Sequence, residues 1–201
     1  MAKLQNVTRA HLGLLLANLV WAVNYPFYKV LMPHYITPVA LATFAVTVAG
    51  LLGLVSLFWG GIEKIDRNDI YKFIGAALLM GIAKKLLLMI GMQHTSPIEA
   101  SIIATLGPIL VLVFSFFFGI DRFTPMKVFG MVLGMGGALL VILSGGGAVT
   151  SGEKLMGNLF VVGAIAASSF SMVWLKGLIM KYRPITVLRV YYPMAAVMLL
   201  P

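Results

Sequence analysis

Residues 81–91, GIAKKLLLMIG, place two adjacent lysines inside an apolar segment that runs from about Phe73 to Met92. This segment has about the 20 residues that a helix needs to cross the hydrocarbon core of a bilayer. A charged side chain at the centre of a bilayer costs at least about 2.5 kcal/mol on insertion scales. Lys84 and Lys85 therefore need a polar lining within the membrane or a route to its surface.

The rest of the chain has the composition of a membrane protein. Of its 201 residues, 61% are hydrophobic and 10% are charged, which is too little polar surface for a soluble globule. Seven apolar segments have the length of a spanning helix: 11–32, 37–59, 72–92, 97–119, 126–145, 156–177 and 185–201. The sequence predicts an all-α, polytopic membrane helix bundle embedded in a lipid bilayer.

The distribution of basic residues predicts the orientation of these helices. With the N-terminus in the cytoplasm, eleven of the fifteen Lys and Arg residues fall on inner segments, and only Lys154 falls in an outer loop. The other three, Lys29, Lys84 and Lys85, lie within spans. Basic residues normally concentrate on the cytoplasmic side, so we expect a cytoplasmic N-terminus. The membrane that we expect is the inner membrane of a prokaryote. The charges are spread over short loops and form no patch for nucleic acid.

The chain also contains a weak internal repeat. The segments 21–44 and 168–191 resemble each other, with Lys29 matching Lys176 and Pro38 matching Pro184. Between them lies a glycine-rich loop, SGGGAVTSGEKLMGN, preceded by five spans, so the sixth span enters the membrane in the opposite direction. This arithmetic is typical of an inverted-topology repeat.

Three stretches carry a family resemblance: WAVNYPFYK at 21–29, TSPIEASIIATLGPIL at 95–110 and GIDRFT at 119–124. They resemble the EamA-like domain of the drug/metabolite transporter superfamily, and the likeness runs from about residue 11 to residue 201. The chain departs from the family pattern at Asp121, where glutamate is usual, and at Thr43, where arginine is common.

The resemblance implies a ten-helix transporter of small metabolites, often an exporter, with its path between two five-helix repeats. We therefore expect a five-plus-five architecture of which about seven helices are present. Residues 1–148 form the first EamA-like repeat in this interpretation, and residues 149–201 begin a second repeat that is C-terminally truncated.

Two environments for the central lysines remain open. Lys84 lies about 18 Å along the helix from Lys72, whereas a lysine stem extends only about 6 Å. A water-filled cavity beside both lysines would solve this problem, with Glu99 as the acid available to Lys85. Alternatively, a helix that is short or kinked near Gly81 would bring both lysines to a wet boundary as anchors.

Other polar and helix-breaking residues extend the predicted path. Pro26 removes a backbone hydrogen bond and bends its helix, so Asn24 and Lys29 form a polar notch there or Lys29 snorkels outward; the resemblance favours the notch. Gly107 and Pro108 predict a kink in the fourth span, either mobile or rigid. The predicted path comprises Asn24, Lys29, Lys84, Lys85, Glu99 and Ser101, and the predicted hinges are Pro26, Gly107 and Pro108.

The fifth span has a face of small residues. Gly130, Gly134 and Gly137 include GxxxG spacing, which allows two helix backbones to approach closely. This face could pack within the monomer or between two copies, and the family resemblance favours a homodimer seam or a scaffold.

Enzyme chemistry is not expected. The chain has no cysteine, and His11, His34 and His94 lie near different span ends without a clear third metal ligand. Glu99 is the single carboxylate within the spans, and no catalytic cluster or phosphate-binding loop is evident.

The sequence therefore predicts no catalytic residues, no metal and no cofactor. The favoured function is a secondary transporter of small-molecule substrates, namely amino acids or other carboxylate-bearing or amphiphilic metabolites, acting as an exporter. The alternative is a non-transporting membrane scaffold or partner subunit.

Overall fold

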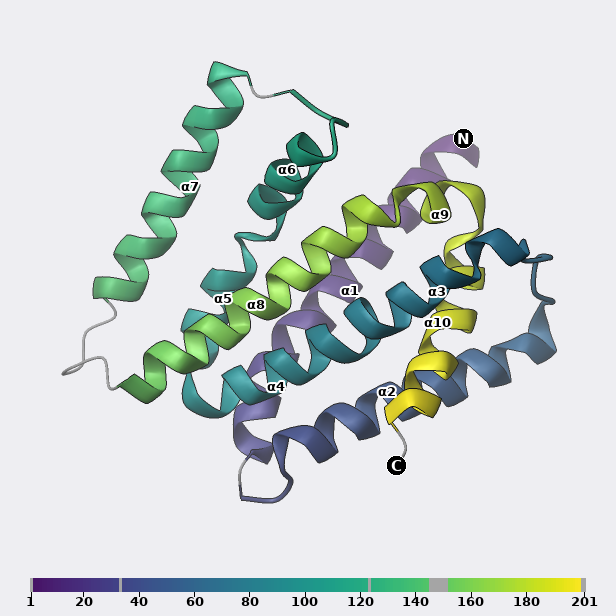
Figure 1. The fold of residues 1–201 in the computed structure, drawn as a ribbon, viewed down its shortest axis with the longest axis horizontal. Helices are drawn as coiled ribbons and strands as arrows, with labels where there is room; N and C mark the ends of the chain where they lie inside the picture. Colours follow the sequence, from purple (N-terminus) through teal and green to yellow (C-terminus); the bar gives the residue numbers. More distant parts are fainter. Residues whose placement is uncertain (1, 33, 123, 145–151, 200–201) are drawn as a thin grey trace.

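The computed structural model describes residues 2–32, 34–122, 124–144 and 152–199, and Figure 1 shows them as a helical bundle. The α-helices are α1 (Ala2–Leu31), α2 (Pro38–Val55), α3 (Ile70–Ala76), α4 (Lys84–His94), α5 (Pro97–Ala104), α6 (Gly107–Phe117), α7 (Pro125–Ser144), α8 (Gly152–Trp174), α9 (Lys176–Lys181) and α10 (Pro184–Leu199). Two short 3₁₀ helices, η1 (Ser56–Trp59) and η2 (Arg67–Asp69), and a π-helix, η3 (Ala77–Ala83), complete the described elements.

Five helical segments are long and apolar enough to cross a membrane: His11–Leu31, Pro38–Trp59, Arg67–His94, Pro97–Phe117 and Gly152–Trp174. They correspond to five of the seven predicted spans, and the protein is an integral membrane protein. The other two predicted spans are helical as well, as α7 and as the shorter apolar helix α10.

The third span contains a feature that the sequence did not reveal. Residues 70–94 are helical throughout, but η3 joins α3 to α4 as a π-helix that ends immediately before Lys84. A π-helix pairs residues i and i+5 and therefore changes the direction in which the following side chains point. Gly81 lies in η3 where α10 passes closely, because an added Cβ would lie 2.5 Å from the Ala195 Cβ.

The fourth span is broken where the sequence predicted a kink. α5 ends at Ala104 and α6 begins at Gly107. The intervening backbone is tightened, since Thr105 and Leu106 donate to the carbonyl oxygens of Ile102 and Ile103. Pro108 then occupies the first turn of α6, a position where the missing N–H of proline costs nothing.

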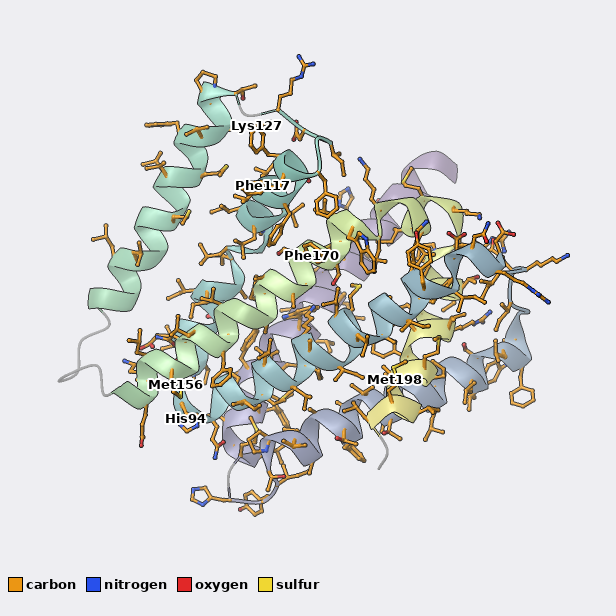
Figure 2. All side chains as sticks on the ribbon, in the orientation of Figure 1. His94, Phe117, Lys127, Met156, Phe170 and Met198 are labelled. Atoms are coloured by element: carbon orange, nitrogen blue, oxygen red, sulfur yellow. The ribbon has the colours of Figure 1, made fainter. Side chains whose placement is uncertain are left out.

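α8 runs through the middle of the bundle between α4 and α6, whereas α7 lies at one edge (Figure 1). The α4–α8 crossing is made by two glycines, since an added Cβ on Gly91 would lie 2.8 Å from the Gly157 carbonyl oxygen. Further along α8 lies Phe170 (Figure 2), which packs edge-to-face against Phe114 of α6 with ring centroids 5.6 Å apart.

Two groups of buried apolar side chains hold the bundle together. One joins α1, α2, α4 and α5 to α8 through Val161, Ala164 and Ile165. The other joins α2 and α3 to α9 and α10, with Phe73 of α3 lying 5.7 Å from the ring of Tyr182.

Pro38 and Pro184, which the internal repeat matched, each begin a helix, α2 and α10. The inverted repeat itself stays a prediction. Its proposed boundary between residues 148 and 149 lies outside the described residues.

Candidate functional site

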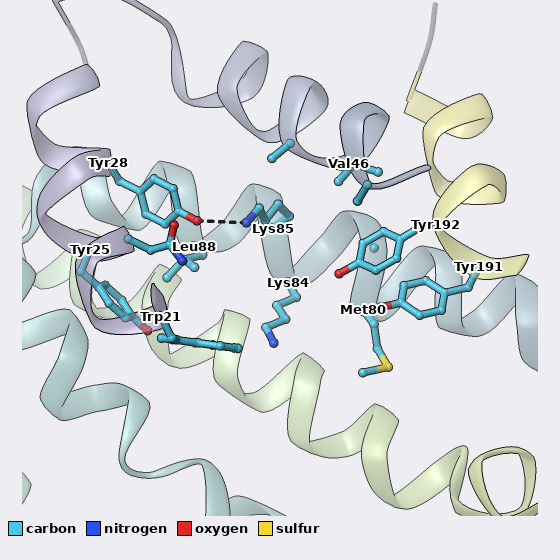
Figure 3. Close-up of a pocket in the computed structure, with 14 residues that line it drawn as sticks. Trp21, Tyr25, Tyr28, Val46, Met80, Lys84, Lys85, Leu88, Tyr191 and Tyr192 are labelled. Atoms are coloured by element: carbon cyan, nitrogen blue, oxygen red, sulfur yellow. Dashed lines mark hydrogen bonds between the residues drawn. The ribbon is translucent and has the colours of Figure 1, made fainter. Parts of the chain in front are cut away.

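A cavity of about 260 Å³ opens beside the central lysines. It is bounded by α1, α2, η3 and α4, which precede the glycine-rich loop in the sequence, and by α10, which follows it. Figure 3 shows Lys84 and Lys85 on one wall, with the rings of Trp21 and Tyr28 on α1 and those of Tyr191 and Tyr192 on α10. Asn24 also lines this cavity.

The two lysines have different partners. Lys85 donates a hydrogen bond of 3.1 Å to the Tyr28 hydroxyl, and its ammonium lies 5.3 Å from the centre of the same ring. The Lys84 ammonium lies 5.3 Å from the centre of the Trp21 ring. Within the described part of the chain, Lys84 has no hydrogen-bond acceptor or ion-pair partner.

The aromatic wall on α1 follows helical spacing. Trp21, Tyr25 and Tyr28 are separated by four and three residues, which places them on one face of the helix. On α10, the rings of Tyr191 and Tyr192 lie 4.3 Å apart at a tilt of 30°. Sequence reasoning did not select these aromatic residues, because such side chains in a membrane helix usually serve packing or anchoring.

Lys29, in the last turn of α1, reaches the end of α4 with its ammonium and is not among the residues that line the cavity. Its ammonium donates to the carbonyl oxygens of Gln93 and Thr95 at 3.1 and 3.0 Å, with that of Met92 at 3.4 Å. The last carbonyl groups of a helix have no partner within the helix, and a lysine is well suited to them. Lys29 therefore caps α4.

Glu99 forms a polar cluster between α5 and α8. Its carboxylate binds the Lys154 ammonium at 2.6 Å and accepts hydrogen bonds from Asn158 at 3.0 Å and Thr95 at 3.3 Å. The Thr95 hydroxyl also contacts the Asn158 side chain. This arrangement differs from the expected pairing with Lys85, because Glu99 is fully engaged by α8 and its own turn.

Ser101 and two predicted hinge residues line a second, more open groove of about 810 Å³. The groove lies between α1 and the broken fourth span and includes Pro26 and Pro108. Trp21 and Tyr25 line this groove as well as the central cavity. The Ser101 hydroxyl donates to the Ile98 carbonyl oxygen at 2.7 Å within its own helix. α1 remains helical through Pro26.

Arg189 is a buried polar residue that the sequence alone did not single out. From α10, its guanidinium donates to the Ser56 hydroxyl at 2.8 Å and to the Ser56, Gly60 and Gly61 carbonyl oxygens at 2.6, 2.5 and 3.1 Å. These acceptors lie where η1 ends and the following loop begins. Arg189 thus ties α10 to the end of the α2 segment.

A third polar cluster joins the 60–69 loop region to α9. Lys181 forms ion pairs with Asp66 and Asp69, and the Tyr182 hydroxyl donates to Asp69 at 3.0 Å. Hydrogen bonds with these two aspartates raise the pKa of the Lys181 ammonium above its usual range. Nearby, the Arg183 backbone N–H donates to Glu63 at 2.8 Å.

The glycine face of α7 is largely uncovered. An added Cβ on Gly130 or Gly137 would have no atom within 4 Å among the described residues, whereas one on Gly134 would lie 2.9 Å from the Ile109 side chain of α6. Two glycines instead face each other where α4 crosses α8, at Gly91 and Gly157. GxxxG spacing did not reveal this crossing, because each helix contributes a single glycine.

These observations define a polytopic membrane protein with a ligand-sized cavity lined by cations and aromatic rings. Residues 8–143 match the EamA-like transporter family, and the chain belongs to that family. It is a family of membrane transporters and not of enzymes, which confirms both the resemblance and the expected absence of enzyme activity.

Individual relatives agree with this assignment. An "Uncharacterized transporter" of Archaeoglobus fulgidus is 26% identical over 153 residues, covering 76% of this chain and 52% of the relative. "Uncharacterized transporter YvbV" of Bacillus subtilis is 27% identical over 177 residues, covering 87% of this chain and 54% of the relative. The chain thus spans about half the length of these curated relatives.

One solved structure, titled only "Crystal structure of protein", is similar with a TM-score of 0.57 and 19% identity. The match covers 91% of this chain and 65% of that chain. At this identity, the likeness concerns the fold alone.

Proposed function

We propose that this protein is a secondary transporter that exports small carboxylate-bearing or amphiphilic metabolites, amino acids among them, across the inner membrane of a prokaryote. The observation that carries the proposal is the cavity with two lysines, since no aspartate or glutamate is among its lining residues. Ionisable groups at membrane depth normally mark a substrate or ion pathway, and the excess positive charge here favours anions.

The position of the cavity supports the same function. Its walls come from α1, α2 and α4 on one side of the glycine-rich loop and from α10 on the other. Substrate sites of transporters built from two repeats lie at the repeat interface, beside discontinuous helices. The break between α5 and α6 is such a discontinuity, and it lies beside the groove that shares Trp21 and Tyr25 with the cavity. We assign Gly107 and Pro108 as hinge residues on this basis.

Flux measurements test this function directly. Protein reconstituted into liposomes loaded with labelled organic acids or amino acids should release them with saturable kinetics. Lys84→Met and Lys85→Met should each reduce this flux, whereas Lys64→Met, which alters an exposed loop lysine, should not. No saturable flux from the unaltered protein, or full flux from a correctly inserted double variant, would refute the proposal.

For topology, we propose a cytoplasmic N-terminus, supported by the excess of basic residues on the segments that this orientation places inside. Since the chain has no cysteine, single cysteines can be introduced without background. An impermeant maleimide added to whole cells should label Glu153→Cys and leave Lys64→Cys unlabelled. If only Lys64→Cys is labelled, the N-terminus lies outside the cytoplasm and the proposed orientation is wrong.

The open face of α7 supports a second role as a contact between copies. Gly130 and Gly137 leave a surface on which another helix could pack closely, and a homodimer would cover it. Crosslinking of Gly130→Cys in membranes should give a dimer. A stoichiometric foreign partner on this face, together with absence of flux, would favour a scaffold or partner subunit instead.

A further inference from the structure

The two cavity lysines are unequally satisfied. Lys85 has the Tyr28 hydroxyl as an acceptor, whereas the Lys84 ammonium has only the face of the Trp21 ring as a polar partner among the described residues. A cation–π contact offsets only part of the cost of removing an ammonium from water without an ion pair. Lys84 is therefore the group in the cavity with the greatest need for an anionic acceptor.

The lining also limits what else a ligand can carry. The fourteen lining residues contribute two ammonium groups and no carboxylate. A ligand ammonium would thus enter an already positive space without an acid to pair with. At about 30 Å³ per water molecule, the cavity of about 260 Å³ has the volume of about nine waters, which limits a ligand to the size of a single substituted ring.

Aromatic rings stand on opposite walls of the same space. Trp21 and Tyr25 face it from α1, while Tyr191 and Tyr192 face it from α10 (Figure 3). Ring pairs in stacked or edge-to-face contact are stabilised beyond the burial of their surface. A flat ring placed between these walls could make such contacts with both helices.

We infer that the cavity selects small aryl monocarboxylates, in which one aromatic ring carries a carboxylate and no ammonium. The ligand carboxylate forms an ion pair with Lys84, which replaces the contact between Lys84 and the Trp21 ring. The ligand ring occupies the space between the aromatic walls of α1 and α10. This inference rests on the proposed transport function only in identifying the cavity as the substrate site.

Calorimetric titration of the purified protein in detergent tests the inference without any flux. Phenylacetate should bind at least about tenfold more tightly than phenylalanine, because 1.4 kcal/mol corresponds to a factor of ten and an unpaired ammonium costs more than that. Cyclohexylacetate, which has the same charge and a saturated ring, should bind about two- to tenfold more weakly than phenylacetate.

Lys84→Met should abolish phenylacetate binding, while Lys64→Met should retain it. Circular dichroism and gel filtration check that Lys84→Met is folded, and if it is not, the ligand ranking on the unaltered protein decides. Equal or tighter binding of phenylalanine, tighter binding of succinate, or no phenylacetate binding at all would overturn the inference.

The two proposals fail separately. If phenylacetate binds in the expected order but no flux occurs in liposomes, the proposed binding site is supported and the proposed transport function is refuted. If amino acids show saturable flux and phenylalanine binds more tightly than phenylacetate, the proposed transport function is supported and the proposed selectivity for aryl carboxylates is refuted.

Discussion

Removal of the charge on Glu99 should destabilise the contact between the first five spans and α8. The Glu99 side chain is 7% exposed and that of Lys154 is 29% exposed, and their charged atoms lie 2.6 Å apart. Loss of one partner from a fully buried pair costs about 3 to 5 kcal/mol. Because Lys154 keeps contact with solvent or headgroups, we expect about 2 to 3 kcal/mol for Glu99→Gln.

The assay is thermal unfolding in detergent, followed by tryptophan fluorescence. For a chain of this size, each kcal/mol shifts the melting temperature by about 2 to 4 °C, so Glu99→Gln should lower it by about 4 to 12 °C. The matched control is Glu153→Gln, which makes the same change on an exposed neighbour of Lys154 and should shift the melting temperature little.

A double-mutant cycle isolates the ion pair from the rest of the cluster. Glu99→Gln keeps an oxygen for Asn158, so the variant removes the charge and little of the shape. Combined with Lys154→Met, it should destabilise by about 1 to 2 kcal/mol less than the sum of the single changes. Effects that add to within about 0.5 kcal/mol would refute the claim that these two residues stabilise each other.

Three further changes probe the packing and the other polar contacts. Gly91→Val should prevent folding, because its Cβ would lie 2.8 Å from a backbone oxygen of α8, whereas Gly130→Val points into open space and should be tolerated; gel filtration in detergent separates the two outcomes. Arg189→Met should lower the free energy of unfolding by about 3 kcal/mol, because four charge-assisted hydrogen bonds are lost. The same change at the exposed Arg67 should have little effect. Similar melting temperatures for the two variants would contradict the role of Arg189 in joining α10 to the end of the α2 segment. Tyr182→Phe should cost about 1 kcal/mol by leaving Asp69 and Asp66 without their phenol partner, and an unchanged melting temperature would argue against that contact.

Local chemistry was enough to predict the helices and the break in the fourth span. Apolar segments of spanning length specify helices, since the membrane offers the backbone no other hydrogen-bond partner. Gly107-Pro108 breaks the fourth span because proline cannot continue the backbone ladder. The cost of burying Lys84 and Lys85 likewise restricted both lysines to a polar cavity or a wet boundary, and both residues line a cavity.

Contacts between distant segments could not be predicted in the same way. Glu99 of α5 pairs with Lys154 of α8, and Lys29 binds carbonyl oxygens 63 to 66 residues away. The π-helix before Lys84 is accompanied by the close approach of α10 at Gly81. Each of these features depends on how helices far apart in the chain pack, and no local pattern encodes that packing.

The central position of α8 bears on how the protein is made. Helices up to Ser144 emerge from the ribosome before α8 does, and the buried surfaces of Met92 and Ile103 then lack the α8 residues that pack with them. No protein side chain of α8 covers these surfaces until Val161 and Ala164 are made. The smallest stretch that can complete this core therefore extends beyond residue 143, where the family match ends.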